Sequence, residues 1–508
     1  MRLREFVPIL PLALALGACD ANASGPQRPN IVLIVIDTLR ADYADPDGGK
    51  ARTPVIDNLA KDGVSFPLAF SHAPATLPSH AALFSSRPPH ETSVRTNGQP
   101  VPKDLPLFAG WLAEHGYETQ AAVSLASMWP SATGRGVDRG FGRYDKGRWT
   151  VTRGDDLNHT LDTALDQLSE DQPFFLFAHY SDPHEPYDAH GAVERFATFT
   201  LDGREFGGAC TSESSQVRHE FVLPRGSHQL VIRSPHAFAV RSLEFAAQNV
   251  DVSWKFERGA LHARTDDLSV IVTNPAPGAV SCQLDLWLHD VIPDPDIPLR
   301  YRGEVEFSDR CVGELLAGLK RRGLYDSSIV VLTSDHGEGL GEHSTYGHIV
   351  HLYDELLHVP LVIKLPSTLP GREPLQAGNK RLVRLIDVVP TLLDLVDLPP
   401  LPDQQGVSML DAEAPRVLVA QTQRANGTHE LFCARDEQYK LIYVPSEDRF
   451  EMYDVAKDPL ELGDIYATAG RERWEWTDML RALAARTRRD GERQIDPESR
   501  ARLDALGY

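Results

Sequence analysis

Acidic and imidazole side chains stand directly after two of the most apolar segments of the chain. Asp37 follows residues 30–36, and the pair Asp335-His336 ends the run of residues 328–336. Clustered carboxylates bind hard divalent cations, and a histidine among them extends the choice to Mn²⁺ or Zn²⁺. Each signal is weak by itself, because an acid after a strand is often only a helix N-cap. Together these residues are candidate ligands of a divalent metal.

A hydroxyl group before a helix is the second candidate for chemistry. Residues 73–80 read Ala-Pro-Ala-Thr-Leu-Pro-Ser-His and form a predicted turn that leads into a helical run over residues 81–85. A hydroxyl at such a place is activated by a metal and by the positive end of the helix dipole. Thr76 and Ser79 are the candidates, each as a nucleophile or as a simple N-cap.

Apolar runs separated by helical patterns must position these groups. Both faces of the runs are apolar, which is typical of buried parallel strands, and the alternation with helices indicates an α/β layer fold. Ligands of such sheets sit beyond the carboxyl ends of the strands, where Asp37, His179 and Asp335-His336 stand. The predicted strands are residues 29–37, 173–179, 328–336 and 359–364, and the predicted helices are residues 55–62, 107–115, 156–167 and 301–322.

Two further regions depart from this alternation. Residues 191–296 consist of short alternating runs between Pro- and Gly-containing turns, which predicts an inserted β-sandwich. Its Cys210 and Cys282 are candidates for a disulfide, whereas Cys311 and Cys433 are predicted to be buried free thiols. Residues 411–508 predict a smaller α+β subdomain, with strands at 430–433 and 439–444 followed by helices.

The first residues have the features of an export signal. Two arginines precede an apolar run too short to span a bilayer, and the run ends in Leu-Gly-Ala-Cys at residues 16–19. This end resembles the bacterial lipobox, which implies a lipoprotein signal peptide over 1–19, a lipidated Cys19 and a tether over 20–28. An ordinary signal peptide with a chance cysteine is the alternative. Asp20 implies retention in the inner membrane, on its periplasmic face. No other stretch approaches 18 uninterrupted apolar residues.

Composition excludes several classes of protein. The 508 residues predict two to four domains, and 42 % apolar with 24 % charged residues is ordinary for a globular chain. Five cysteines are too few for a disulfide-dense scaffold. The formal net charge of −21 repels phosphate backbones, so we expect no nucleic-acid partner.

An ordered series of motifs resembles the sulfatase family of the alkaline-phosphatase superfamily. The resemblance runs from Pro29 to Tyr508 apart from the insert, and implies an alkaline-phosphatase-like sandwich with a mostly parallel central sheet. The catalytic domain would comprise residues 29–190 and 297–410. The matching segments are residues 30–42, 53–60, 76–80, 116–119, 182–187, 334–338, 341–343, 347–348, 352–355, 387–393, 453–455, 458–461 and 506–508.

The resemblance also implies roles for individual residues. Asp37, Asp335 and His336 would hold one divalent cation, Ca²⁺, Mn²⁺ or Zn²⁺, and Thr76 would be both a further ligand and the nucleophile. The remaining candidates line the same site: His184 and His348 would contact the sulfuryl or phosphoryl oxygens, and His80 replaces the Arg that usually follows Pro-Ser in the nucleophile motif.

Three departures from the family pattern bear on the substrate. Typical sulfatases carry a Cys at position 76 that is oxidised to formylglycine, and Thr76 cannot yield an aldehyde, so no formylglycine is expected. Thr38 stands where a second acid is usual, and the Lys-Trp-His segment expected after Tyr117 is missing. A Thr nucleophile with these ligands is similar to superfamily members that act on phosphate esters.

We therefore predict a metal-dependent hydrolase of small-molecule, glycan or lipid-head-group esters that favours phosphate esters or diesters over sulfate. The alternatives are a transferase of phosphoethanolamine or phosphoglycerol head groups at the cell envelope, and a non-catalytic glycan-binding protein.

Overall fold

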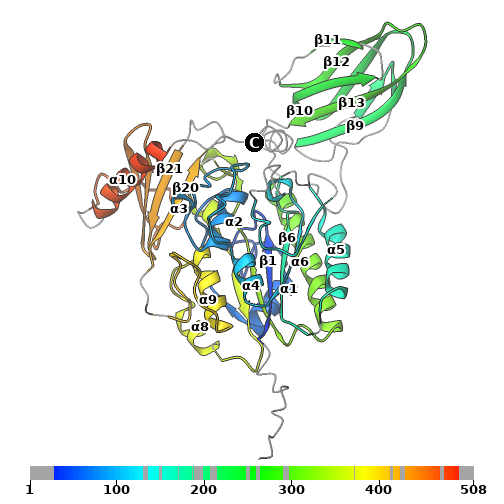
Figure 1. Ribbon diagram of the computed structural model, residues 1–508. Coiled ribbons are helices and arrows are strands. Elements are labelled where there is room, and N and C mark those ends of the chain that lie inside the picture. The colour runs from blue at the N-terminus through cyan, green and yellow to red at the C-terminus, as the bar shows by residue number, and fades with distance from the viewer. Residues whose placement is uncertain are drawn as a thin grey trace, which may run out of the picture.

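The computed structural model describes most of the chain that follows the predicted signal peptide (Figure 1). The described residues are 28–129, 136–147, 151–169, 171–185, 187, 198–205, 214–247, 252–258, 264–289, 297–349, 351–370, 372–411, 413, 416–423, 430–469 and 474–490. The predicted signal peptide, Cys19 and almost all of the tether therefore lie outside them. Within them, no helix has the length and apolar character needed to cross a membrane.

A seven-stranded mixed sheet forms the centre of the molecule. Its strand order is β2-β18-β14-β1-β6-β4-β5, and the five strands from β14 to β5 are parallel to one another. Ile31 of β1 pairs with Ile329 of β14 on one side and Phe175 of β6 on the other. The strands are β1 (Asn30–Ile36), β2 (Val64–Ser65), β4 (Glu118–Val123), β5 (Arg143–Lys146), β6 (Phe174–Tyr180), β14 (Ser328–Thr333) and β18 (Leu361–Lys364).

The sheet differs from the sequence prediction near both edges. The run over 359–364 was predicted as a parallel strand, but β18 pairs antiparallel with β14. Its residues are all buried, and burial on both faces produces the same apolar pattern whichever way a strand runs. At the other edge, β4 and β5 were not predicted, because Glu-Thr-Gln-Ala-Ala-Val and Arg-Tyr-Asp-Lys lack a β-branched apolar run.

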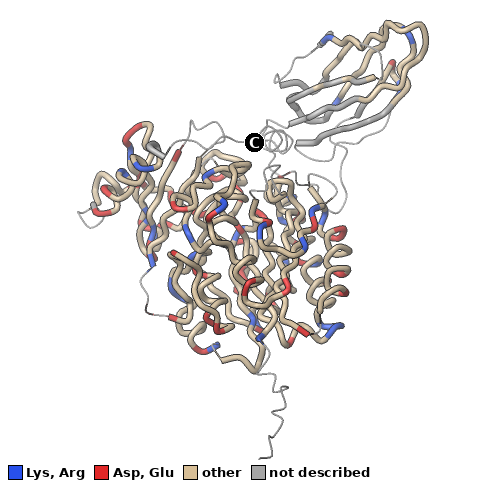
Figure 2. Tube along the Cα trace, in the orientation of Figure 1, with Lys and Arg blue, Asp and Glu red and all other residues tan. Residues whose placement is uncertain are grey.

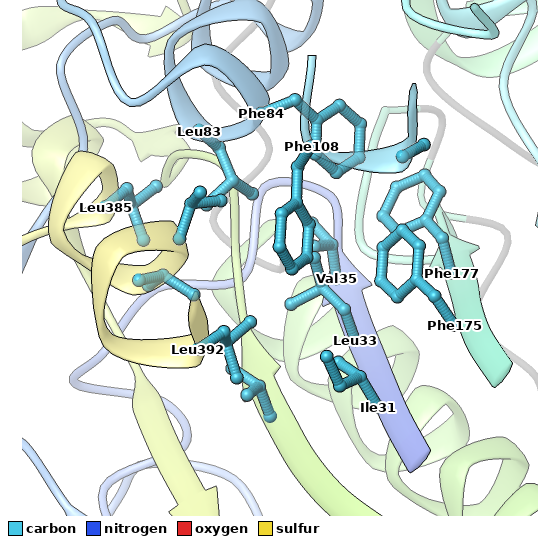
Figure 3. Close-up of a cluster of buried hydrophobic side chains, with 14 of the residues drawn as sticks. Ile31, Leu33, Val35, Leu83, Phe84, Phe108, Phe175, Phe177, Leu385 and Leu392 are labelled. Atoms are coloured by element: carbon cyan, nitrogen blue, oxygen red, sulfur yellow. The ribbon is translucent and has the colours of Figure 1, made fainter. Parts of the chain in front are cut away.

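Helices cover both faces of the sheet, as an α/β layer fold requires. Alternate residues of β1 enter opposite cores. Ile31, Leu33 and Val35 pack with α2 (Thr76–Ser85), α4 (Phe108–Glu114) and α9 (Val388–Leu395), as Figure 3 shows. On the other face, Val32, Ile34 and Ile36 pack with α1 (Pro54–Asp62), α5 (Gly154–Asp166) and α6 (Ile297–Arg321). The four helices predicted from sequence correspond to α1, α4, α5 and α6, shifted by a few residues at their ends.

Between β6 and α6 the described residues are all strands and turns. They form a seven-stranded antiparallel sheet, drawn in green in Figure 1, in which the long β10 pairs with β12 and β7 along one half and with β13 along the other. Leu223, Leu230, Ile232 and Val270 belong to its own apolar cluster. The strands are β7 (Thr198–Leu201), β8 (Arg204–Glu205), β9 (Ser214–Leu223), β10 (Gly226–Ala247), β11 (Ser253–Arg258), β12 (Arg264–Asn274) and β13 (Val280–His289).

The cysteines depart from one expectation. Cys282 is a buried free thiol, so the disulfide expected with Cys210 is not formed, and Cys210 itself lies outside the described residues. Cys311 and Cys433 are buried free thiols, as predicted.

The last part of the chain forms a four-stranded antiparallel sheet backed by one described helix. The order is β20 (Leu418–Gln423), β21 (Glu430–Arg435), β22 (Tyr439–Val444) and β23 (Arg449–Asp454), with α10 (Trp474–Asp490) packed on one face. The sequence predicted only the middle pair. The outer strands were missed because polar residues interrupt their apolar positions, as in Leu-Val-Ala-Gln-Thr-Gln.

Candidate active site

The predicted nucleophile lies at the first position of a helix that is buried along its whole length. Helix α2 begins at Thr76, five residues earlier than the sequence predicted, with Ala75 as its N-cap. The backbone N–H of Leu77 donates to Asn97 Oδ1 at 2.8 Å, which satisfies one of the unpaired donors of the first turn. The Thr76 hydroxyl therefore stands at the positive end of a helix dipole, where a developing alkoxide is stabilised.

The loop after β1 presents Asp37 to this hydroxyl. Thr76 Oγ1 donates to Asp37 Oδ2 at 3.4 Å. The next residue, Thr38, has a φ of 60°, a left-handed conformation that costs energy for a β-branched side chain. Its backbone is held on both sides, because the N–H donates to Asp335 Oδ1 at 3.3 Å and the carbonyl accepts from the Tyr301 hydroxyl at 2.6 Å.

Asp335 and His336 complete the predicted ligand set from the end of the adjacent strand β14. His336 Nε2 lies 3.6 Å from Asp37 Oδ1 and 3.6 Å from Asp335 Oδ2. His336 Nδ1 donates to the carbonyl of Gly337 at 2.9 Å, which leaves the lone pair on Nε2. The structure thus brings Asp37, Thr76, Asp335 and His336 together at the carboxyl ends of β1 and β14, as predicted.

These residues fit a divalent cation. Asp37 Oδ1, Asp335 Oδ2 and His336 Nε2 are buried and have no hydrogen-bond partner. One ligand atom from each residue lies within 4.8 Å of the others. Three unpaired acceptor atoms in one buried space are unfavourable unless a cation sits among them. Two carboxylates with one imidazole suit Mn²⁺ or Zn²⁺ at least as well as Ca²⁺.

The electrostatics of the site indicate the same need for positive charge. Burial raises the pKa of Asp37, and burial together with the charge of Asp37 raises the pKa of Asp335 to about 7. Burial and the neighbouring His348 lower the pKa of His336 to about 4. Among the described residues, no Lys or Arg forms an ion pair with either aspartate.

The predicted oxyanion-contacting histidines lie beside His336. The ring centroids of His184 and His348 are 5.0 Å apart, and those of His336 and His348 are 4.7 Å apart. His184 Nδ1 donates to the carbonyl of Glu185 at 2.6 Å, and His348 Nδ1 lies 3.1 Å from Glu338 Oε1.

His80 lies one turn after Thr76 on α2 and is fully buried. Its Nδ1 donates to the carbonyl of Thr76 at 2.8 Å and stands 3.6 Å from Asp335 Oδ2. Burial lowers its pKa to about 4, so the ring is neutral where the family usually has an Arg.

Sequence reasoning missed three residues of this site. His179, at the end of β6, has Nε2 3.4 Å from Asp37 Oδ2; its place at a strand end was noted without a role. Glu338 is fully buried, with its pKa raised to about 7 by burial. Arg40 donates to the carbonyl of Glu338 at 3.0 Å and to Glu342 Oε1 at 2.9 Å, which fixes the loop after β14 to the loop after β1. Only the strand-end position of His179 was visible in the sequence.

Comparisons with known proteins agree with the fold. Residues 29–398 match the model of the Sulfatase family, and residues 341–487 match that of the N-sulphoglucosamine sulphohydrolase C-terminal region. An N-acetylglucosamine-6-O-sulfatase of Bacteroides thetaiotaomicron is 23 % identical over 91 % of this chain and 87 % of its own length.

Two solved structures show the same fold. A 2-O GAG sulfatase superposes with a TM-score of 0.59 at 20 % identity, covering 93 % of this chain and 96 % of that one. A phosphonate monoester hydrolase of Agrobacterium radiobacter also has a TM-score of 0.59, at 19 % identity over 91 % of this chain and 96 % of that one. Because the family model matches well over half of the sequence, the chain belongs to the sulfatase family and is a sulfatase-like ester hydrolase.

Proposed function

We propose that the protein hydrolyses phosphate esters, diesters in particular, in preference to sulfate esters, with Thr76 as the nucleophile. The observation that carries the proposal is the Thr76 hydroxyl itself. It stands at the first position of a buried helix, 3.4 Å from Asp37 Oδ2, at the place where the family's formylglycine would be. A threonine has no route to an aldehyde hydrate, so it must attack as a hydroxyl.

A divalent cation held by Asp37, Asp335, His336 and Thr76 would lower the pKa of the Thr76 hydroxyl and neutralise charge on the ester. The chain's own groups do the rest. Asp37 Oδ2 accepts the hydrogen bond of the Thr76 hydroxyl and orients Oγ1. The hydroxyl oxygen displaces the alcohol of the ester, and water then displaces Thr76 from the threonyl ester and regenerates the hydroxyl.

The histidines beside the site would contact the ester oxygens. Burial lowers the pKa of His184 and His348, that of His348 to about 4, and the negative charge of a bound ester would favour protonation of both rings. Each protonated ring would then donate to the ester oxygens, while His184 Nδ1 donates to the carbonyl of Glu185 and His348 Nδ1 lies 3.1 Å from Glu338 Oε1. Such preorganised donors are the main source of catalysis in phosphoryl transfer.

The attack of water on the threonyl ester determines whether phosphate or sulfate esters are the better substrates. Formylglycine releases sulfate by collapse of a hemiacetal, so the usual sulfatase does not need water to attack the covalent ester. Thr76 offers no such route, and each turnover needs two in-line displacements. Activated water attacks phosphorus readily, and we therefore expect phosphate esters to turn over faster than sulfate esters.

Initial rates on an aryl sulfate, an aryl phosphate monoester and an aryl phosphodiester test the proposal. We expect the phosphodiester to be fastest, and a sulfate rate tenfold or more above both, about 1.4 kcal/mol of transition-state preference, would overturn it. Thr76→Ala should lower turnover at least about a hundredfold. Thr76→Ser, which keeps the hydroxyl, is the matched control and should retain most of the activity.

The same assay separates hydrolysis from transfer. Release of the phosphoryl group to water alone supports a hydrolase, whereas its appearance on an added alcohol or glycan acceptor would make the protein a transferase. No turnover of any ester by the metal-loaded protein would instead favour a glycan-binding role.

We also propose that Cys19 is lipidated and anchors the enzyme to the periplasmic face of the inner membrane. The support is the lipobox resemblance of residues 16–19 and the Asp that follows. Mass spectrometry of the amino-terminal peptide after expression in a Gram-negative host tests this. Cys19→Ser should release the protein from the membrane fraction, and an unmodified cysteine would refute the anchor.

A further inference from the structure

The loop that carries His348 has a strained backbone. It covers residues 339–349 and contains a small hairpin, in which β15 (Gly339–Leu340) pairs antiparallel with β16 (Tyr346–Gly347). Ile349, directly after His348, has a φ of 76°. A positive φ is a true outlier for a β-branched residue and persists only where the surrounding structure enforces it. The contacts around Ile349 must therefore hold its backbone in place.

The hairpin before this histidine is fixed by two of its side chains. Glu342 Oε1 accepts from Arg40 Nη1 at 2.9 Å, which ties the hairpin to the loop after β1. His343 Nδ1 lies 2.8 Å from Glu355 Oε1, and its Nε2 donates to the carbonyl of Glu461 at 3.3 Å. The chain that leads to His348 is therefore already anchored when it reaches the metal site.

On the other side of His348, a side chain of the C-terminal sheet holds Ile349. The hydroxyl of Thr422, a buried residue of β20, donates to the carbonyl of Ile349 at 2.7 Å. The preceding residue of the same strand, Gln421, donates its backbone N–H to the carbonyl of His72 at 3.0 Å. Strand β20 thus connects the segment before α2, which begins with the nucleophile, to the loop of His348.

We propose that Thr422 is a positioning residue that keeps the imidazole of His348 at the metal site by holding Ile349 in its strained conformation. Without this hydrogen bond Ile349 relaxes toward a negative φ. The hairpin before it is anchored, and Tyr353 after it is fixed by donation to Glu451 Oε2 at 2.8 Å, so the displacement falls on His348. The inference rests on the proposed contact of His348 with the ester oxygens, and it makes the C-terminal sheet a part of the active site.

Thr422→Val removes the hydroxyl at nearly constant volume and tests the proposal by kinetics. On the ester that the metal-loaded unmodified protein hydrolyses fastest, we expect kcat to fall at least about tenfold. Bound metal, measured by mass spectrometry of the element, should not change. Thr422→Ser keeps the hydroxyl and should recover most of kcat. Thr487→Val is the matched control, because the buried Thr487 hydroxyl also donates to a carbonyl, that of Leu483 at 2.9 Å within α10, and it should leave kcat unchanged.

A change at Ile349 tests whether the hydroxyl acts through strain. Glycine adopts a positive φ at little cost, so Ile349→Gly should keep the loop in place without the hydrogen bond. In the Ile349→Gly background, Thr422→Val should therefore lower kcat by less than about threefold. Equal losses in the two backgrounds would overturn the proposal. A lower unfolding free energy of Thr422→Val with unchanged kcat per folded molecule would also overturn it.

His348→Ala separates this inference from the proposed function. If His348→Ala lowers kcat and Thr422→Val does not, the positioning role alone is refuted, and if neither lowers kcat, the proposed role of His348 fails with it. A preference for sulfate would refute only the proposed substrate class, because the variants are compared on one ester. Crystal structures of the unmodified protein and Thr422→Val need no turnover. The centroids of the His336 and His348 rings, 4.7 Å apart, should separate in the variant, and an unmoved His348 overturns the proposal.

Discussion

Two buried clusters of charged groups in this molecule are built in opposite ways. In one of them, Asp354 at the start of α7 (Asp354–Leu357) faces two cations of the C-terminal sheet. Arg435 Nη2 lies 2.9 Å from Asp354 Oδ2, and the fully buried Lys440 Nζ lies 2.8 Å from Oδ1. Lys440 also pairs with Glu461 at 2.9 Å. Arg435 and Lys440 outweigh the effect of burial and hold the pKa of Asp354 well below its usual range.

The cluster at the carboxyl ends of β1 and β14 has the carboxylates without the cations. Asp37, Asp335 and Glu338 are fully buried, whereas the Asp354 side chain is 15 % exposed, and the pKa of each of the three is raised because burial dominates. Their nearest partners are imidazoles with lowered pKa values, such as His336 and His80.

The difference indicates that the paired cluster stabilises the fold and that the other cluster binds a ligand. A carboxylate paired with Arg and Lys is satisfied by the protein and fixes α7 to the C-terminal sheet. A carboxylate facing neutral imidazoles is satisfied only by something that binds. Even within the paired cluster, Glu461, which shares Lys440 with Asp354, has its pKa raised to about 7 because burial outweighs one shared cation.

Removing one carboxylate from each cluster tests most directly whether the two clusters have different roles. Asp335→Asn should abolish metal binding and lower turnover by about a thousandfold or more, roughly 4 kcal/mol, because the nucleophile loses its activation. The metal-free variant should unfold no more easily than the metal-free parent, since the change removes a buried carboxylate that pairs with no Lys or Arg among the described residues. Asp354→Asn should leave metal binding and turnover unchanged but lower the free energy of unfolding. Steady-state kinetics and urea unfolding of both variants measure this, and destabilisation by Asp335→Asn would contradict it.

Removing a cation from the paired cluster should affect stability alone. Lys440→Met leaves Asp354 and Glu461 buried with one cation fewer, which costs about 3–5 kcal/mol of unfolding free energy. Turnover per folded molecule should stay unchanged. Chemical unfolding with activity normalised to folded protein measures both, and an unchanged midpoint would show that the cluster contributes nothing to stability.

Glu338 allows a test by pH. Its pKa in the folded protein is raised to about 7 from an unfolded value near 4.5, so the folded state holds its proton longer. The stability that Glu338 contributes therefore falls as pH rises from about 4.5 to 7. The unfolding free energy of metal-free Glu338→Gln, relative to the metal-free parent, should rise by about 1–3 kcal/mol between pH 5 and 8. A constant difference would show that Glu338 is ionised throughout.

Exposed ion pairs should contribute less to the free energy of unfolding than the buried ion pairs do. Helix α5 carries acidic residues and no Lys or Arg, and the end of α6 is basic (Figure 2). Arg322, just after α6, lies 2.6 Å from Asp166 and 2.9 Å from Asp162. Arg322→Ala should change the unfolding free energy by less than about 1 kcal/mol, because water screens such pairs. Thermal unfolding at low and high salt measures this. A larger, salt-independent loss would mean that the arginine stem packs as part of the core.

The sequence alone was sufficient for the α/β class and for locating the candidate ligands Asp37, Asp335 and His336. Residues 30–36 and 328–333 are apolar on both faces, so the strands and the acids that follow them could be located without coordinates. The resemblance to sulfatases then assigned roles to Thr76, His184 and His348. The direction of β18 and the alanine-rich β4 were not predictable, because strand direction and pairing depend on partners distant in the chain.

Only the tertiary structure revealed how the site is charged. Glu338 and Arg40 are 298 residues apart, and their contact forms when α6 and the central sheet bring the two loops together. The neutral state of His80 and His179 has no local signal, since a neutral ring and a protonated one have the same letter. His80 Nδ1 bonds to the carbonyl of Thr76 in the same helix α2, and His179 Nδ1 lies 3.4 Å from the hydroxyl of Ser124, just after β4. Burial, which sets every pKa in this cluster, is a property of the packed fold.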